Sequence, residues 1–380
     1  MTNNKIKIID VAGTSQGAYR LLRNRVKKIN EDGRFINYII TPKGNYNEIM
    51  KKEQIPIIEV DFTRKINMQI FSEIKILRNI IKEIQPNIVH SHSSKGGALA
   101  RLAVSRLDNE LRSKMKVIHQ VHGYHFTKYN GIKKFIFENI EKYLMRYTDY
   151  LLFQNKYEYE ITNCWKKDKK VKLELIGNGI EINEIKKFRK DDERKETLIV
   201  CIARLEPIKN HGYLIEALGY LKNNLRFFDF KVYFIGEGNS KKFETVIKNN
   251  KLEENIVFTG VLNKKEVYEI LSKSKLSVLA SFKEGKPRAL MESSVLGVPM
   301  VATNVIGTNE VVQHGKTGYL VELDNPKEFA KRMYELLTNE KKWKEFSQNA
   351  KKYAEKEFDE DKIIEKLKKI YTEELSNYIT

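Results

Sequence analysis

The sequence predicts an α/β protein made of two doubly wound, Rossmann-like domains. Strand-like apolar runs alternate with helical periodicity along most of the chain, and the alternation restarts once after a polar stretch. Strands that alternate with helices of about 10–15 residues form parallel sheets. A chain of 380 residues is also longer than one hydrophobic core usually supports. We therefore expect two parallel sheets, in separate domains that face each other across a cleft.

The predicted elements follow from this alternation. The first half carries seven apolar runs of strand length, at residues 5–11, 35–41, 55–60, 88–91, 117–121, 150–153 and 172–176. The second half carries six, at residues 197–202, 230–235, 256–259, 275–279, 299–302 and 318–321. Helical spacing of apolar side chains is clearest at residues 68–84, 129–146, 211–221, 241–249, 264–272 and 287–296.

These elements divide the chain into four parts. We expect an N-terminal domain at residues 1–185, a polar linker at 186–196, a C-terminal domain at 197–355 and a final amphipathic helix at 356–380. From about residue 339 the chain is rich in Lys and Glu, with apolar residues at helical spacing. The final helix is expected to pack back on the N-terminal domain.

Composition narrows the class of protein. Hydrophobic residues make up 41% of the chain and charged residues 31%, which is typical of a folded globular protein. No run of about 18 apolar residues is present, so no membrane-spanning helix is expected. The first apolar run is broken at Asp10, which argues against a signal peptide. Cys164 and Cys201 match no metal-binding spacing, and we expect them to be reduced thiols in a cytosolic protein.

The net charge of +19 is concentrated in the first half. Residues 1–190 contain 37 Lys+Arg and 20 Asp+Glu, a net charge of +17, whereas residues 191–380 contain 32 and 30, a net charge of +2. This asymmetry indicates an anionic partner for the first half. A lipid headgroup surface attracts each nearby basic residue by about 1 kcal/mol. Nucleic acid is the competing partner, but the sequence has no helix-turn-helix, zinc-finger or RRM motif.

The most informative stretch runs from Glu284 to Glu292. It follows an apolar strand and opens a helical run, in which Pro287 suits the first turn and Gly297 the C-terminal stop. Glu284 is therefore expected on a loop at the carboxyl end of a strand, where open parallel sheets bind ligands. The plain alternative is a helix start with an acid near its positive end, and spacing alone gives it equal weight.

Two cations follow the first strand of the second half. Arg204 and Lys209 lie in the loop after residues 197–202, at the same predicted sheet edge as Glu284. A guanidinium binds phosphate oxygens as a fork and an ammonium binds them as a point charge, so the pair suits a diphosphate. The alternative is a solvated basic loop, which is the commoner origin of any one such pair.

Three loops of the first half also follow predicted strands. Gly13 and Gly17 bracket a turn whose backbone N–H groups suit a phosphate or sugar, although a plain turn is the commoner structure. His122 and His125 follow the strand at 117–121. A third loop carries side chains that hydrogen-bond hydroxyls and anionic groups, namely His90, Ser93 and Lys95.

No metal is expected from these residues. The histidines form no HExxH pattern, and no DxD motif follows an early strand. The acidic cluster at 359–361 lies in the charged C-terminal region. Charge on a departing diphosphate is instead expected to be met by Arg204, Lys209 and helix N-termini.

Together these segments resemble glycosyltransferase family 4, the retaining nucleotide-sugar enzymes of the GT-B fold. The stretch from Glu284 to Glu292 is similar to that family's Glu-x7-Glu motif, and Arg204 with Lys209 is similar to its phosphate clamp. The segments 90–97 and 121–126 resemble first-domain loops of bacterial members that build surface polysaccharides, and the resemblance covers nearly the whole chain.

The resemblance implies roles for the matched residues of the second half. Arg204 and Lys209 would hold the donor diphosphate, and Glu292 would accept hydrogen bonds from the ribose hydroxyls. Glu284 would act at the donor sugar together with the backbone that follows it, Gly285, Lys286 and Pro287. Lys286 departs from the apolar residue of many relatives, and Arg288 adds a second charge.

The resemblance also implies roles in the first half. His122 would lie near the reaction centre as the second catalytic residue, after Glu284. Gly13 and Gly17 would let the first domain close on the phosphates. The implied acceptor contacts are His90, Ser93, Lys95 and His125.

We therefore expect a retaining glycosyltransferase that moves a sugar from a nucleotide diphosphate donor to a hydroxyl of a glycan. The expected donor is UDP-linked, and the expected acceptor is carried on a lipid diphosphate. It would need no cofactor and no metal, bind no nucleic acid, and act in the cytoplasm at the anionic inner face of the plasma membrane through its basic half. Two alternatives stay open. One is another enzyme of the same fold, a nucleotide-sugar epimerase or sugar phosphorylase, and the other is a basic nucleic-acid-binding protein.

Overall fold

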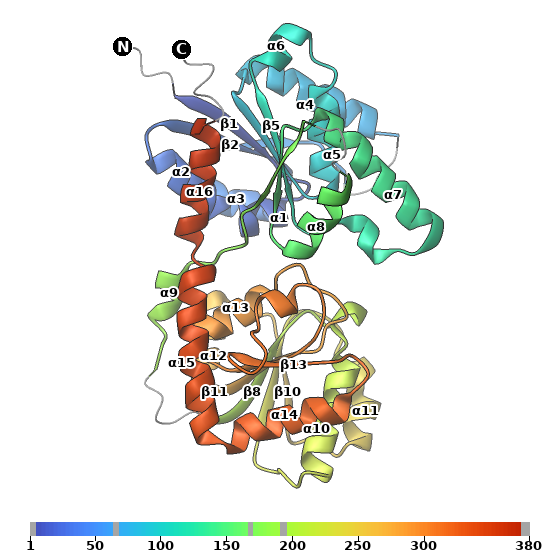
Figure 1. The fold of residues 1–380 in the computed structure, drawn as a ribbon, viewed down its shortest axis with the longest axis vertical. Coiled ribbons are helices and arrows are strands. Elements are labelled where there is room, and N and C mark those ends of the chain that lie inside the picture. The colour runs from blue at the N-terminus through green and yellow to red at the C-terminus, as the bar shows by residue number, and fades with distance from the viewer. Residues whose placement is uncertain (1–4, 64–67, 166–169, 191–195, 374–380) are drawn as a thin grey trace. The chain divides into compact units, whose positions relative to one another are not determined.

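The computed structural model describes residues 5–63, 68–165, 170–190 and 196–373 (Figure 1). Contacts divide the chain into two compact units, the first containing Met1–Gly177 and Lys362–Thr380 and the second containing Asn178–Asp361. The second unit therefore begins before the predicted boundary at residue 185, because Ile180, Ile182 and Ile185 are buried in its core. The predicted linker at 186–196 lies partly outside the described residues.

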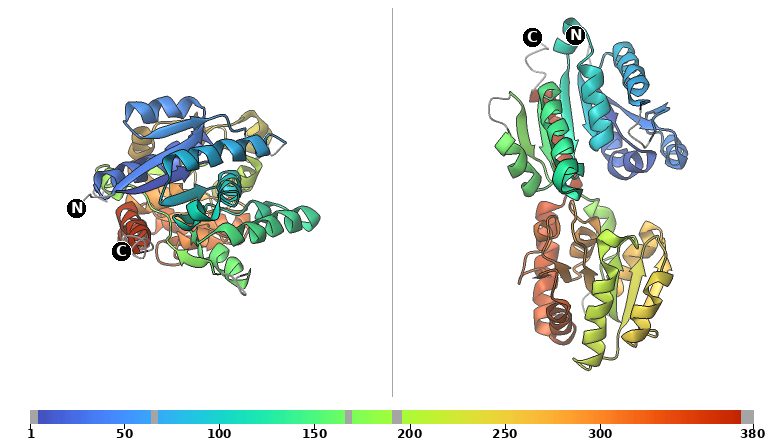
Figure 2. Two further views of the ribbon diagram at one scale, coloured as in Figure 1. Left: turned by 90° about the horizontal axis from the view of Figure 1, so that it is seen from above. Right: turned by 90° about the vertical axis from the view of Figure 1, so that its right-hand side faces the viewer.

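The first unit is built on a seven-stranded parallel sheet with the order β3-β2-β1-β4-β5-β6-β7. Its strands are β1 (Ile6–Val11), β2 (Phe35–Pro42), β3 (Ile57–Val60), β4 (Ile88–His92), β5 (Lys116–Val121), β6 (Tyr150–Phe153) and β7 (Lys172–Leu175). Its helices are α1 (Ser15–Leu21), α2 (Arg23–Glu31), α3 (Asn45–Lys52), α4 (Ile70–Ile84), α5 (Ser94–Val104), α6 (Asn109–Ser113), η1 (His125–Lys128), α7 (Gly131–Leu144), η2 (Met145–Tyr147), α8 (Lys156–Trp165) and α16 (Glu360–Glu373). Helix α5 contacts both α4 and α7, and Figure 2 shows α7 at the edge of this layer of the unit.

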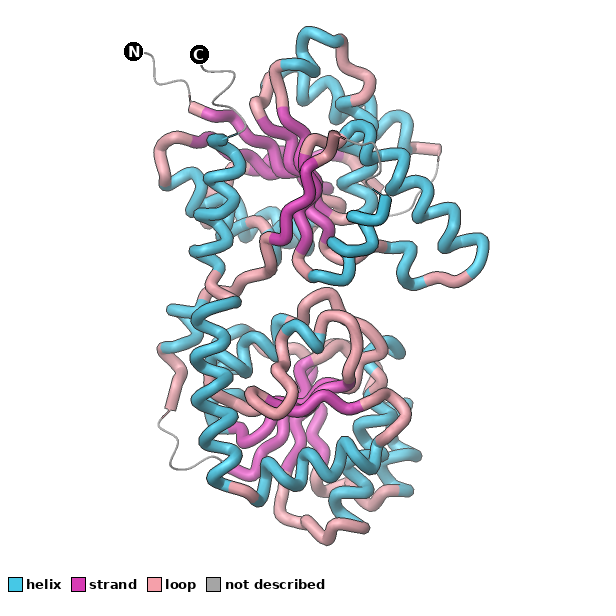
Figure 3. Tube along the Cα trace, in the orientation of Figure 1, coloured by secondary structure: helices cyan, strands magenta, loops and turns pink. Residues whose placement is uncertain are grey.

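The second unit is built on a six-stranded parallel sheet with the order β10-β9-β8-β11-β12-β13. Its strands are β8 (Glu196–Ile202), β9 (Lys231–Ile235), β10 (Ile256–Gly260), β11 (Ser274–Leu279), β12 (Met300–Thr303) and β13 (Gly318–Val321). Its helices are α9 (Ile182–Lys186), η3 (Pro207–Lys209), α10 (His211–Asn223), η4 (Lys241–Phe243), α11 (Glu244–Asn249), α12 (Lys264–Lys273), α13 (Arg288–Val295), η5 (Thr308–Glu310), α14 (Pro326–Thr338) and α15 (Glu340–Glu357). In each unit the strands lie between layers of helices (Figure 3).

The predicted α/β class of two parallel sheets is confirmed. Every predicted strand is present, with ends that differ by no more than two residues from those expected. The C-terminal segment forms α15 and α16, as its helical spacing predicts. Among the described residues, none of the helices combines the length and the apolar character needed to cross a bilayer.

Helix α16 belongs to the first unit. Its Ile364, Leu367 and Tyr371 share one buried cluster with strand residues that include Ile6 and Phe35. Figure 1 shows α16 beside β1 and α2. The apolar side of this helix therefore covers part of the first sheet, although it lies far away in the sequence.

The order of the strands reverses at one position in each sheet. β1 pairs with β2 on one side and with β4 on the other, and β8 pairs with β9 and with β11 in the same way. Ligands of open parallel sheets bind at such switch points, outside the carboxyl ends of the strands. The loops after β1, β4, β8 and β11 are therefore the places to look for a site.

Candidate active site

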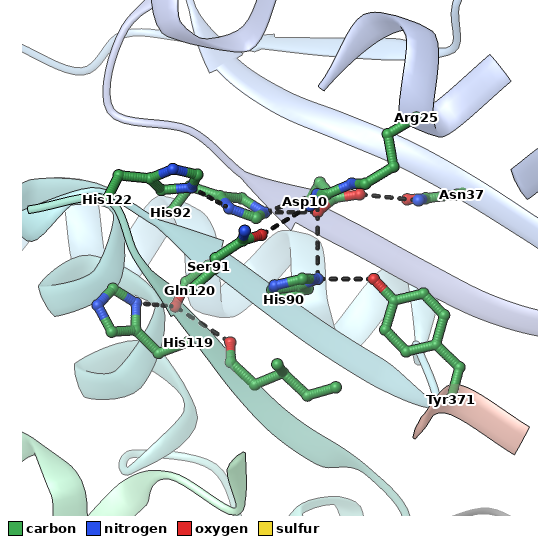
Figure 4. Close-up of polar contacts among 11 residues, drawn as sticks. Asp10, Arg25, Asn37, His90, Ser91, His92, His119, Gln120, His122 and Tyr371 are labelled. Carbon is green, nitrogen blue, oxygen red and sulfur yellow. Dashed lines mark hydrogen bonds and ion pairs between the residues drawn. The ribbon is translucent and has the colours of Figure 1, made fainter. Parts of the chain in front are cut away.

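A polar cluster lies at the carboxyl ends of β1 and β4 in the first unit (Figure 4). Asp10 of β1 is in register with His90 of β4, and both are fully buried. Asp10 Oδ1 accepts a hydrogen bond from Arg25 Nη2 at 2.5 Å, and its Oδ2 accepts one from Asn37 Nδ2 at 2.7 Å. The buried guanidinium of Arg25 is thus neutralised by a buried carboxylate, as buried charges require.

A chain of hydrogen bonds runs from Asp10 to His122. His92 Nε2 lies 2.6 Å from Asp10 Oδ1, and because a carboxylate only accepts, we assign a proton to that nitrogen. His92 Nδ1 is then an acceptor, so His122 Nε2 donates to it across 3.1 Å. His122 Nδ1 accepts from Gln154 Nε2 at 2.7 Å. Both ring nitrogens of His122 therefore have partners within the first unit, and its tautomer is set by Asp10 through His92.

Burial keeps these imidazoles neutral. Desolvation lowers the pKa of His90 and His92 well below the usual range, and it lowers the pKa of His122 to about 3, with the charge of Arg25 contributing at each. Neutral rings at physiological pH agree with the assigned tautomers. His122 is thus a fixed donor and acceptor, not a group that gains a proton near neutral pH.

Asp10, His90 and His92 also present ligand atoms within 4.8 Å of one another, a spacing that suits a metal ion. However, Arg25 Nη2 lies 2.5 Å from Asp10 Oδ1 and 2.9 Å from His92 Nε2. The guanidinium therefore already contacts the carboxylate oxygen that a cation would use, and His92 Nε2 carries the proton assigned above. A second positive charge beside it would be repelled, so this arrangement does not fit a metal.

The residues expected to contact the acceptor lie in different surroundings. His90 Nδ1 lies 2.7 Å from the Tyr371 hydroxyl of α16, and the ring has no exposed surface with which to contact an acceptor. Lys95 forms an ion pair with Glu73 of α4 at 2.9 Å. Ser93 precedes α5 and is exposed. The side chain of His125 lies outside the described part of the structure.

The two glycines of the first loop lie close to neighbouring hydroxyl groups. A Cβ atom at Gly13 would lie 2.8 Å from Ser93 Oγ, and one at Gly96 would lie 3.0 Å from Gly13 N, so the loop after β1 touches the start of α5. The N–H of Gly17 donates to Thr14 Oγ1 at 3.0 Å, which caps α1. That N–H is therefore used inside the helix cap.

In the second unit the structure brings Lys209 and Glu284 together. Lys209 ends η3 in the loop after β8, and Glu284 follows the neighbouring strand β11. Lys209 Nζ lies 2.6 Å from Glu284 Oε1, and Ser281 Oγ donates to the same oxygen at 2.5 Å. The side chains of Lys209 and Glu284 are only 18% and 10% exposed. The two sequence motifs thus meet at the switch point of the second sheet.

Two other predicted residues lie on the same loop and on the helix that follows Glu284. Arg204 lies on the same loop as Lys209, but its side chain is 59% exposed and its Nη1 forms an ion pair with Glu206 at 2.6 Å. Glu292 lies on α13, where burial raises its pKa and the charges of Arg288 and Lys264 oppose the rise. The two predicted phosphate cations therefore have different carboxylate partners.

Between Glu284 and Glu292, the structure corrects the predicted start of the helix and shows what Lys286 and Arg288 contact. Pro287 is the N-cap of α13, with an extended ψ of 109°, so the helix begins one residue later than predicted. Lys286 Nζ lies 5.2 Å from the centre of the Phe358 ring, and burial lowers the pKa of this lysine. Arg288 Nη1 donates to Gly179 O at 3.4 Å. These two cations thus contact neighbouring parts of the second unit.

A glycine outside the motif holds the Glu284 loop. Gly307 has a φ of +88°, and a Cβ atom there would lie 2.5 Å from Gly285 O and 2.7 Å from Glu284 O. Glu284 N donates to Ile306 O at 3.1 Å. The two backbone segments are therefore as close as a residue without a side chain permits.

Sequence reasoning named His122, Lys209 and Glu284 as candidates but did not name the residues that contact them. Asp10 carries a detectable signal, since an acid inside an otherwise apolar strand must find a buried partner. Arg25 and Ser281 carry none, because a cation on a helix and a serine at a strand end are ordinary.

Two family models match the chain. "Glycosyl transferases group 1" matches residues 181–353, and "Glycosyl transferase 4-like" matches residues 17–155. The first match lies within the second unit and the second match lies within the first unit. Both compact units are therefore accounted for by glycosyltransferase models.

Individual relatives agree with these matches. The chain is 25% identical over 395 residues to the UDP-Gal:alpha-D-GlcNAc-diphosphoundecaprenol alpha-1,3-galactosyltransferase of Escherichia coli, covering 99% of both chains. It is 32% identical to the N-acetylgalactosamine-N,N'-diacetylbacillosaminyl-diphospho-undecaprenol 4-alpha-N-acetylgalactosaminyltransferase of Campylobacter jejuni, over 50% of this chain and 51% of the relative. The crystal structure of Anabaena Alr3699/HepE in complex with UDP and glucose has the same fold, with a TM-score of 0.76 at 16% identity over 97% of this chain and 99% of that one.

Proposed function

This chain is a GT-B glycosyltransferase, and we propose that it transfers a sugar from a UDP-linked donor, with retention of configuration, to a hydroxyl of a glycan carried on a lipid diphosphate. Two relatives named for transfer onto diphospho-undecaprenol acceptors support the acceptor class. The E. coli relative is named for UDP-galactose, and the Anabaena structure contains UDP, which supports the nucleotide. Retention rests on the resemblance to family 4.

The donor diphosphate binds at the switch point of the second sheet. The single observation that carries this proposal is the 2.6 Å contact between Lys209 Nζ and Glu284 Oε1, which joins two motifs 75 residues apart. A lysine held by a carboxylate and a serine is fixed in position before the ligand arrives, so little side-chain entropy is lost on binding. Arg204, from the same loop, supplies a second, more exposed cation for the phosphates.

Glu284 and Glu292 then face different parts of the donor. Glu292, one turn into α13, accepts hydrogen bonds from the ribose hydroxyls, while Glu284 and the backbone of Gly285 contact the sugar. His122 of the first unit acts as a neutral hydrogen-bonding group at the reaction centre, with its orientation fixed by His92 and Gln154. Burial lowers its pKa and favours the neutral ring, and we assign the acceptor proton to the departing phosphate.

No metal takes part in this proposal. Negative charge that develops on the leaving diphosphate is met by the ammonium of Lys209 and the guanidinium of Arg204. Their chemistry suits this role because charge-assisted bonds to phosphate are short and strong.

The lipid-linked acceptor places the reaction at a membrane surface. By sequence, the first unit contains 37 basic and 21 acidic residues, a net charge of +16, and the second contains 32 and 29, a net charge of +3. The first unit is therefore the part that an anionic bilayer attracts. We propose that the enzyme binds peripherally to such a surface.

The test is sugar transfer by the purified full chain, with a panel of UDP-, GDP- and ADP-sugars and a short diphosphate-linked glycan as acceptor. We expect one UDP-sugar to be used without added metal and in the presence of a chelator. Lys209→Ala should lower kcat/KM by about 100-fold, the typical loss on removing one such charge-stabilising donor. Glu292→Ala should raise KM for the donor by about tenfold, since one charged hydrogen bond is lost.

Exposed residues of the same unit provide matched controls. Lys248→Ala and Glu253→Ala remove the same charges from surface positions, and both should transfer sugar like the wild type. Unchanged transfer by Lys209→Ala and Glu292→Ala would show that the site is wrong. Conversion of the donor sugar without any acceptor would identify an epimerase instead.

A further inference from the structure

Helix α7 carries large apolar side chains on its outward side. Its exposed residues include Ile132, Phe135, Ile136, Ile140 and Tyr143, with exposures from 43% to 76%. Their spacing of three and four residues puts them on one stripe of the helix. Figures 1 and 2 show α7 along the outside of the first unit. A contiguous exposed apolar stripe on a soluble domain marks an interaction surface.

The opposite side of α7 fixes this orientation. Glu141 forms a buried ion pair with Arg101 of α5 at 2.9 Å, and Leu144 is also buried. Phe137 packs against a core cluster that contains Tyr124 and Phe126. Rotating the helix to hide the apolar stripe would break the ion pair and leave a buried charge unpaired, which typically costs about 3–5 kcal/mol. The polar anchor thus faces inward and the apolar stripe faces outward.

Basic residues border the stripe. Lys133 and Lys134 are exposed at the start of α7, Lys133 beside the stripe and Lys134 on the side of Glu141, and Arg146 is exposed just after the end of the helix. The only acids among residues 131–146 are Glu138, which pairs with Lys142, and the buried Glu141. An apolar stripe of Ile, Phe and Tyr with a basic border is the composition of a helix that lies in a membrane interface.

We propose that α7 lies in the plane of an anionic lipid bilayer and inserts its outward stripe at the headgroup boundary. The partner is a bilayer because the border is basic and the unit carries a net charge of +16, so two copies facing each other through this stripe would repel. The purpose of this contact rests on the proposed function, since it would bring the enzyme to a lipid-linked acceptor. The binding itself needs neither donor nor acceptor.

Vesicle sedimentation of the full chain tests the proposal without any sugar chemistry. The wild type should bind vesicles of phosphatidylglycerol and phosphatidylcholine at least tenfold more tightly than vesicles of phosphatidylcholine alone. Ile132→Gln/Phe135→Gln should weaken binding to the anionic vesicles at least tenfold. Lys133→Gln/Lys134→Gln should weaken it several-fold and reduce its dependence on salt.

Matched controls test whether vesicle binding is specific to this surface or is promoted by any exposed apolar or basic residue. Phe228→Gln removes an aromatic residue that is 56% exposed in the second unit, and Lys327→Gln/Lys331→Gln removes two exposed lysines from α14. Both should bind vesicles like the wild type, and all variants should keep the wild-type Tm because the changed residues are exposed. The proposal would be overturned if Ile132→Gln/Phe135→Gln bound vesicles like the wild type. It would also be overturned if the wild type were a dimer and this variant a monomer.

Sugar transfer distinguishes failure of this inference from failure of the proposed function. With a water-soluble acceptor that lacks the lipid, Ile132→Gln/Phe135→Gln should transfer sugar at the wild-type rate. With the lipid-linked acceptor in anionic vesicles it should be at least tenfold slower. Equal rates in both assays would reject α7 as the membrane contact and leave the transferase assignment standing.

Discussion

Among single residues, two carboxylate–guanidinium pairs differ in burial. They should therefore differ in how much stability is lost when the carboxylate is replaced. Asp10 and Arg25 are 0% and 6% exposed at their side chains, whereas Glu206 and Arg204 are 41% and 59% exposed. Asp10→Asn should lower the free energy of unfolding by about 3–5 kcal/mol, because it leaves a guanidinium buried without its counter-charge. Glu206→Gln should change it by about 1 kcal/mol or less. Urea denaturation measures both, and equal losses would contradict the argument.

The Glu206→Gln variant carries a second prediction at the same scale. In the wild type a bound diphosphate must compete with Glu206 for the guanidinium of Arg204. Removing the carboxylate should tighten UDP binding by about two- to fivefold, the equivalent of one exposed ion pair. Calorimetric titration with UDP at low and high salt measures the effect, which should shrink at high salt. Unchanged affinity would show that Arg204 does not reach the phosphates.

At the scale of elements, the loops at the strand ends depend on backbone approaches that only glycine permits. Gly307 and Gly315 both have positive φ, +88° and +74°, but a Cβ at Gly307 would collide with Gly285 O, whereas a Cβ at Gly315 would meet no atom within 4 Å beyond its chain neighbours. Gly315→Ala should cost about 1–2 kcal/mol of stability from its backbone conformation alone. Gly307→Ala should cost more and should also raise the Kd for UDP, because the Glu284 loop must move.

Thermal unfolding and UDP titration of both variants measure these effects. If Gly307→Ala and Gly315→Ala lose the same stability and keep the same affinity, Gly307 does not support the donor site.

The helices and strands could be predicted from the sequence more fully than the side-chain contacts of the candidate site. Strands such as 150–153 and 318–321 were predicted to the residue, because a short apolar run bounded by turns has one common structure. Lys209 and Glu284 were predicted at one sheet edge, because carboxyl ends of neighbouring parallel strands meet there. The hydrogen bond between His90 and Tyr371 was not predictable, because it joins residues 281 positions apart and depends on how α16 packs.

At the scale of the whole molecule, the two units differ in their buried histidines. In the first unit, burial lowers the pKa of four of them, His90, His92, His119 and His122. Among the described residues of the second unit, burial has this effect at His211 alone, to about 4. The first unit is therefore the part whose stability depends more on pH.

The sign of this dependence follows from proton uptake. Below about pH 6.5 the unfolded chain protonates its histidines while the folded chain keeps these rings neutral, so the unfolded state binds more protons and stability falls as the pH falls. Each such histidine contributes up to about 1.4 kcal/mol per pH unit, until the pH reaches its folded pKa, about 3 for His122. The stability that the neutral rings provide is fully present above about pH 7.

We therefore expect Tm to fall steeply between pH 7 and pH 5, with the first unit losing structure before the second. Circular dichroism measures the Tm, and hydrogen exchange at pH 5.5, corrected for intrinsic rates, should show β1 and β4 losing protection before β8 and β11. His122→Gln should flatten the pH dependence, because one titrating group with a lowered pKa is removed. A Tm that stays constant from pH 7 to pH 5 would contradict the burial of neutral histidines around Asp10.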